Sequence, residues 1–179
     1  AIQRLVEERL VRKVARRGSF VHLPSMKEIE EIMSLRVVLE GFVWERATNR
    51  WKPESERRLR AIVERMHQAR EQQDRHWMYR LDCEFHAAVW EMADHSILLQ
   101  VVSGLRARIN YFLYEAVVHG LPMGVFARHV RGHAFLIDVL REGDVAAARD
   151  AIKKHVLGGR DRILRCWQER FPDRLTADS

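Results

Sequence analysis

The feature that most constrains this chain is its scarcity of helix-breaking residues. Only four prolines and nine glycines occur in 179 residues, so long helices are the expected structure. From residue 26 onward, apolar residues recur with a helical period that turn-forming residues interrupt at 51–53, 94–96, 119–122 and 142–144. We therefore predict an all-α fold, an antiparallel bundle of about six helices, over 26–49, 54–72, 74–94, 96–118, 122–142 and 145–170.

The first 25 residues follow a different pattern. A short apolar helical face comes first, and two β-prone stretches then flank the turn Arg16-Arg17-Gly18-Ser19, which predicts a hairpin with a basic tip. Six basic and two acidic residues lie in this segment, so most of the net charge of +6 is there and favours a polyanionic partner. We expect one unit over 1–23, a helical domain over 26–171 and a tail over 172–179.

Composition excludes several classes of protein. No apolar run approaches the roughly 20 residues of a membrane span, and no secretion signal opens the chain. The two cysteines form no CxxC pair and no disulfide framework. A cytoplasmic protein without a membrane partner is the expectation.

Four metal-ligating side chains fall on apolar, inward-facing stripes of three predicted helices. Asp82 and His86 lie one turn apart, and His133 and His155 each interrupt a stripe on a later helix. Three histidines and one carboxylate suit a borderline divalent metal, whereas a single histidine on such a stripe is more often a hydrogen-bonded core residue. His129, one turn before His133, is expected to be exposed rather than a ligand.

Arg36 interrupts the inward stripe of the first long helix. A buried guanidinium needs an anionic partner, either an organic acid or Glu40, which is one turn away. Weaker candidates for the same cavity, all on the helix predicted over 96–118, are Arg106, Arg108, Asn110 and Tyr111.

The N-terminal residues resemble the end of the GntR-type DNA-binding domain, in which a recognition helix leads into a strand and an RRGxFV wing. The resemblance implies that Arg4 lies late on the recognition helix, that Arg16 and Arg17 contact DNA, and that Gly18 serves the wing turn. It also implies two further helices before Ala1. This chain departs from the pattern with Glu8-Arg9, where the family usually has Glu-Gly.

The helical part resembles the metal-binding version of the FCD domain, the effector domain of FadR-type regulators. The matching motifs are DxxFH at 82–86, a histidine at 133 followed by Gly143-Asp144 and His155, and LRxxLE at 35–40. The resemblance implies that the four ligands bind Zn²⁺, with Ni²⁺ or Mn²⁺ as alternatives, and that Arg36 faces the effector. Two departures are Asp94-His95-Ser96 in place of Gly-Asn, and Gly132 where the family often has Glu.

These patterns favour a DNA-binding transcriptional regulator, not an enzyme, that forms a homodimer, binds operator DNA and responds to a small organic acid beside the metal. One alternative is a helical-bundle metalloenzyme, but HExxH is absent and the only ExxH pair is at 64–67. Another alternative is a metal sensor without an organic effector.

Overall fold

The computed structural model describes residues 2–122 and 124–172, and within them the fold is helical with one small hairpin. The predicted all-α class is therefore confirmed. Seven residues of the tail expected over 172–179, namely 173–179, lie outside the described residues. The elements are α1 (Ile2–Glu7), β1 (Val11–Val14), β2 (Gly18–Val21), α2 (Met26–Thr48), α3 (Pro53–Glu71), α4 (Arg75–Met92), α5 (Ser96–Tyr114), the π-helix η1 (Glu115–Gly120), α6 (Val125–Glu142) and α7 (Val145–Arg170).

Local signals explain where the helices begin and end. Ser25, Asp74 and Asp144 cap α2, α4 and α7, each accepting a hydrogen bond from a backbone N–H of the first turn. Pro53 occupies the first position of α3, where its missing N–H costs nothing. At the end of α6, Gly143 adopts φ +79°, a left-handed conformation that terminates the helix.

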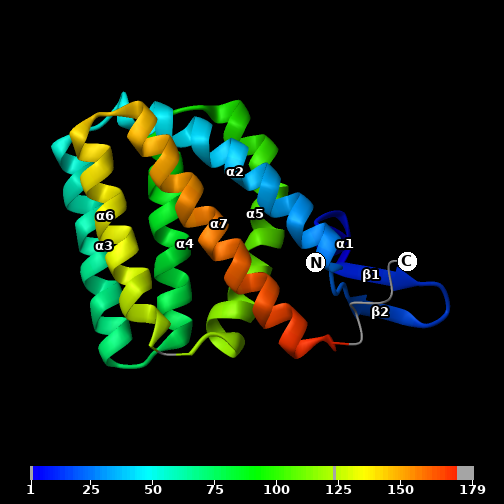
Figure 1. Ribbon diagram of the computed structural model, residues 1–179. Coiled ribbons are helices and arrows are strands. Elements are labelled where there is room, and N and C mark those ends of the chain that lie inside the picture. Colours follow the sequence, from blue (N-terminus) through cyan, green and yellow to red (C-terminus); the bar gives the residue numbers. More distant parts are fainter. Residues whose placement is uncertain (1, 123, 173–179) are drawn as a thin grey trace.

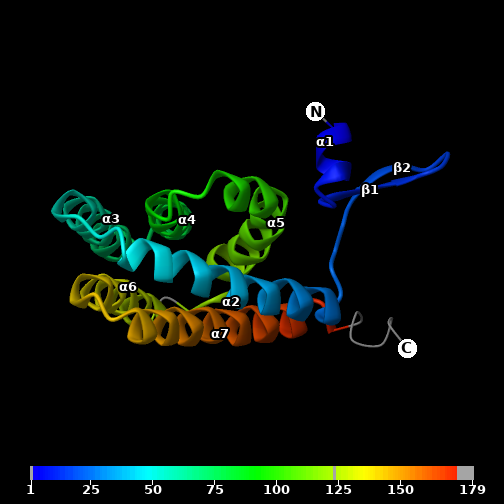
Figure 2. The ribbon, with the colours of Figure 1, turned by 90° about the horizontal axis from the view of Figure 1, so that it is seen from above.

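Helix α2 lies at the centre of the bundle. Figure 2 shows α6 and α7 along one side of α2, with α4 and α5 on the other, and α2 contacts all four helices. Helix α3 packs against α4 and α6 (Figure 1). Because α4, α6 and α7 all lie near α2, inward-facing residues of these helices meet in one interior.

Two predicted boundaries near residue 120 are wrong. The helix predicted over 96–118 is an α-helix only to Tyr114 and continues as a π-helix to Gly120. A Cβ at Gly120 would lie 2.7 Å from Sγ of Cys166, so only glycine allows this close approach of η1 to α7. The next helix begins at Val125 instead of 122, because Pro122 belongs to the turn and accepts the backbone hydrogen bond of Val125.

The N-terminal elements stand apart from the bundle (Figure 2). Strands β1 and β2 pair antiparallel, with Val11 opposite Val21 and Val14 opposite Gly18. At the hairpin tip, Arg16 has φ +61° and Gly18 has φ +106°, so the turn uses the conformational freedom of a glycine.

Candidate metal centre

Three helices bring the four predicted metal ligands together. Asp82 and His86 are on α4, His133 is on α6 and His155 is on α7. One ligand atom from each of the four lies within 4.8 Å of the corresponding atoms of the others. The imidazole rings are also close, with centroids 4.8 Å apart for His133 and His155 and 5.3 Å for His86 and His155. The arrangement therefore has the compactness that a shared ion requires.

His133 is oriented by the backbone of its own helix. Its Nδ1 donates a 2.9 Å hydrogen bond to the carbonyl oxygen of His129, which leaves Nε2 with a lone pair. This Nε2 is 3.3 Å from Oδ1 of Asp82, yet it has no hydrogen-bond partner. In a tetrahedral zinc site, ligand atoms lie about 3.3 Å apart. The pair is thus spaced as two ligands of one ion.

Buried nitrogens without hydrogen-bond partners indicate which kind of ligand the site would hold. Both ring nitrogens of His86 and Nε2 of His133 are buried and form no hydrogen bond. Burying unpaired polar atoms is costly, and each such atom in a native core calls for an explanation. A divalent cation would satisfy one ring nitrogen of His86 and Nε2 of His133 together with the Asp82 carboxylate, so the donor set fits a metal.

The expectation that His129 is exposed is wrong. Its Nε2 lies 3.0 Å from Oδ1 of Asp82, and its ring centroid is 4.4 Å from that of His133. Burial alone would raise the pKa of Asp82, but the contacts with His129 and His133 outweigh it and hold this pKa well below its usual range. Asp82 is therefore ionised, and its carboxylate lies against two imidazoles of α6.

Glu40 is the anionic partner of Arg36, one of the two alternatives expected from the sequence. Its buried carboxylate accepts hydrogen bonds from Nε of Arg36 at 3.2 Å and from Nε1 of Trp90 at 2.8 Å, and it lies 3.4 Å from Nδ1 of His86. Burial raises the pKa of Glu40, but His86, Arg36 and Trp90 together lower it to about 2. The spacing of one turn between Arg36 and Glu40 was visible in the sequence, whereas the contacts of Glu40 with Trp90 and His86 join different helices.

A cavity adjoins the cluster on the side of α4 and α5. Arg36, Asp82, His86, Arg106 and Asn110 are among the residues that line it. Its volume is about 20 Å³, enough for about one water, so a larger ligand requires side chains to move. Tyr111 is not among the lining residues and packs against Trp167 instead, with ring centroids 6.0 Å apart.

The predicted DNA-contacting residues lie on the elements that stand apart from the bundle. Arg4 is exposed on α1 and forms a 2.9 Å ion pair with Glu8. Arg16 and Arg17 are exposed at the hairpin tip, and Gly18 opens β2. The basic side chains are therefore accessible to a polyanion.

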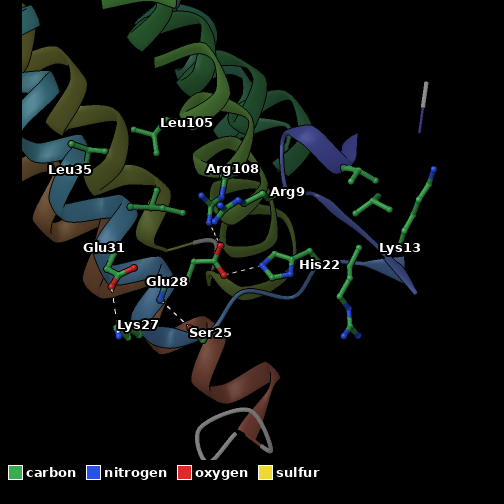
Figure 3. Close-up of a pocket in the computed structure, with 14 residues that line it drawn as sticks. Arg9, Lys13, His22, Ser25, Lys27, Glu28, Glu31, Leu35, Leu105 and Arg108 are labelled. Carbon is green, nitrogen blue, oxygen red and sulfur yellow. Dashed lines mark hydrogen bonds and ion pairs between the residues drawn. The ribbon is translucent and has the colours of Figure 1, made fainter. Parts of the chain in front are cut away.

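An ionic cluster joins the linker after β2 to the bundle. Figure 3 shows the Glu28 carboxylate between His22 of the linker and Arg108 of α5. His22 Nε2 donates to Glu28 at 2.9 Å, and the Glu28 backbone N–H donates to Oγ of Ser25. Glu28 of α2 thus connects α5 to the linker that leads to the hairpin.

Comparison with known proteins identifies the class. The FCD domain matches residues 31–158, so the chain belongs to the FCD domain family. The chain is 24% identical over 172 residues to the HTH-type transcriptional repressor RspR of Escherichia coli K12, which covers 94% of this chain and 73% of that protein.

Solved structures agree with this assignment. The fold is similar to that of E. coli McbR/YncC, with a TM-score of 0.82 and 19% identity over 92% of this chain and 81% of that one. It is also similar to a putative transcriptional regulator GntR from Rhodococcus sp. RHA1, with a TM-score of 0.73 and 20% identity over 92% of this chain and 77% of that one. The E. coli K12 relative is named as a transcriptional repressor and the Rhodococcus protein as a putative transcriptional regulator. Among the described residues, no helix has the length and apolar character to cross a membrane.

Proposed function

We propose that the chain belongs to a transcriptional regulator of the GntR family and is not an enzyme. We propose further that it binds a divalent metal through Asp82, His86, His133 and His155, and a small organic acid beside the metal. The observation that carries the proposal is the convergence of four ligand atoms within 4.8 Å around buried nitrogens that lack partners. Three nitrogens and one oxygen favour Zn²⁺, with Ni²⁺ or Mn²⁺ as alternatives. A metal that prefers five or six ligands keeps positions open for an acid.

Arg36, Arg106 and Asn110 are the proposed contacts to the acid, because they line the cavity beside Asp82 and His86. Arg36 uses Nε to bind Glu40, and its guanidinium carries further N–H donors for a ligand carboxylate. Tyr111 is not among the proposed acid contacts, because it packs against Trp167.

The acid would act on DNA binding through α5. Arg106 and Asn110 face the cavity, while Arg108 on the same helix bonds Glu28, which also holds His22 of the linker. A displacement of α5 on ligand binding would therefore reach the hairpin through this cluster. We propose that Arg4, Arg16 and Arg17 contact operator DNA, with Gly18 shaping the wing, in a cytoplasmic regulator of the FadR subfamily.

A homodimer is part of the proposal. Five large apolar residues on α2 and α5 are 41–69% exposed: Leu35, Val38, Phe42, Ile97 and Val101. The exposed residues of α2 lie beside those of α5. Phe42 of α2 contacts the ring of His95 at the start of α5. Leu35 of α2 and Leu105 of α5 line the same cleft (Figure 3). A continuous apolar stripe of this kind is self-complementary about a two-fold axis, and a two-fold dimer matches a palindromic operator. We call this surface the apolar stripe.

The test is a thermal-shift screen of hydroxy acids, sugar acids and dicarboxylates on metal-loaded and metal-free protein. One class of acid should raise the melting temperature of the metal-loaded protein only. Arg36→Gln and Arg106→Gln should reduce that rise, whereas Arg131→Gln, which removes an exposed charge from α6, should not. An acid that stabilises the metal-free protein equally, or both cavity variants as well as wild type, would refute the effector site.

The narrowness of the cavity favours a second candidate function. A space of about 20 Å³ accepts a water but no organic acid without rearrangement, as expected of a sensor of the metal itself. This function predicts that metal alone changes operator affinity, in a gel-shift titration of a chain with the complete DNA-binding domain, and that no acid adds to the change.

A further inference from the structure

A second cavity lies on the other side of the metal cluster. Asp82 and His86 line the cavity beside α4 and α5, whereas His129 and His155 line this one, between α6 and α7. Its volume is about 150 Å³. The residues that line it are Val125, Arg128, His129, Gly132, Lys154, His155, Gly158 and Arg162.

The charges around this cavity are unbalanced. Three of its eight lining residues, Arg128, Lys154 and Arg162, are cationic, and none is acidic. Within the described ranges, no ion pair or side-chain hydrogen bond engages any of the three. Arg162 is half-buried, whereas Arg128 and Lys154 are exposed. Burial lowers the pKa of Arg162, Asp82 and Asp161 oppose this, and Arg165 and Arg128 add to the lowering. Among the described residues, no carboxylate lies within ion-pair distance of this half-buried guanidinium, so it can accept an anionic partner.

The shape of the cavity leaves these cations accessible to a small ligand. Gly132 and Gly158 contribute no side chain, so the space between the helices stays open. A Cβ at Gly132 would lie 3.9 Å from Nδ1 of His155, and a Cβ at Gly158 would lie 3.5 Å from Nη1 of Arg162. Both side chains therefore border the opening.

We propose that this cavity is a binding site for a small oxyanion, a carboxylate or inorganic phosphate, held by Arg128, Lys154 and Arg162. Ligand pockets for drug-sized molecules span about 300–1,000 Å³, so a cavity of this size suits an anion of few atoms. Guanidinium and ammonium groups are the donors that bind such oxygens most strongly. We call it the α6–α7 anion site, and it is separate from the effector cavity beside Arg36.

Calorimetric titration of the full chain tests the site, with inorganic phosphate in one arm and acetate in the other, in chloride buffer at low ionic strength. Saturable binding is expected in at least one arm, which also identifies the source of the oxyanion. Lys154→Gln and Arg128→Gln should each weaken affinity about tenfold, as for a lost charge-assisted hydrogen bond. The matched variants Lys153→Gln and Arg131→Gln remove the same charge from exposed neighbours outside the cavity and should change affinity less than about twofold.

A variant that adds a negative charge to the cavity tests the proposal independently. Gly132→Glu places a carboxylate in the cavity, where it would pair with the cations and abolish anion binding while the protein stays folded. No binding by wild type, equal weakening by the matched controls, or undiminished binding by Gly132→Glu would overturn the proposal. Arg36→Gln separates the two sites, because it should leave anion binding intact even if the effector proposal fails.

Discussion

The stabilisation that a metal provides should depend on His133. This residue is fully buried on α6, with its ring 4.7 Å from that of Phe85, and its Nε2 lies 3.3 Å from the Asp82 carboxylate. Metal present at 100 times its dissociation constant adds about 2.7 kcal/mol to the free energy of unfolding. For a chain of this size that corresponds to a rise in melting temperature of about 5–11 °C.

His133→Ala should remove nearly all of that rise. Losing one of four ligands weakens binding by about 100-fold or more, so the same metal concentration then adds only about 0.4 kcal/mol, or less than about 2 °C. The substitution also leaves a cavity beside Phe85, which lowers the stability of the metal-free protein by about 2–4 kcal/mol. The quantity to compare is therefore the difference between metal-loaded and metal-free melting temperatures within each variant.

Differential scanning calorimetry with Zn²⁺, and with Ni²⁺ and Mn²⁺ in parallel, measures this difference, and elemental analysis gives the bound metal. His67→Ala on α3 is the matched control, because His67 is outside the cluster, and it should keep the full rise. A His133→Ala protein that retains both the rise and one equivalent of metal would refute the reasoning, as would a wild-type protein that none of the three metals stabilises.

Three further predictions concern assembly and DNA binding. Val38→Glu introduces a charge into the apolar stripe and should halve the mass measured by light scattering, whereas Phe135→Glu, at a site 58% exposed on α6, should leave it unchanged. In a chain with the complete DNA-binding domain, Arg16→Gln and Arg17→Gln should each weaken operator binding and reduce its salt slope by about 0.9; an unchanged slope argues against phosphate contact. Glu28→Gln breaks the ionic cluster and should abolish the ligand-induced change in operator affinity with ligand affinity intact, and a full response would exclude this route of coupling.

Much of the fold was predictable from local patterns. Prolines, glycines and capping residues act on their own turn of helix, so the breaks at Pro53, at Ser96 and at Gly143 placed helix ends to within a few residues. The four ligands were predictable for a related reason. Each lies on the apolar stripe of its own helix, and a stripe that faces inward carries its polar members inward as well.

Other parts of the site depend on distances between helices, which a helical period does not contain. The contacts of Glu40 with Trp90 and of His129 with Asp82 became recognisable only when α2, α4 and α6 were placed side by side, because each pair joins two helices. The sequence also could not show that Tyr111 packs against Trp167 of α7 instead of lining the effector cavity, because this contact joins two helices.

The amino-acid sequence by itself determined which segments are helical, which side chains each helix turns inward, and where the basic hairpin lies. All three follow from interactions within one or two turns of chain. The tertiary structure alone decided the spacing of the four ligands, the Arg36–Glu40–Trp90 network, the close approach of Gly120 to Cys166 and the basic cavity between α6 and α7. These features arise from the packing of residues far apart in the chain, and packing depends on the shapes of all the surfaces in contact at once.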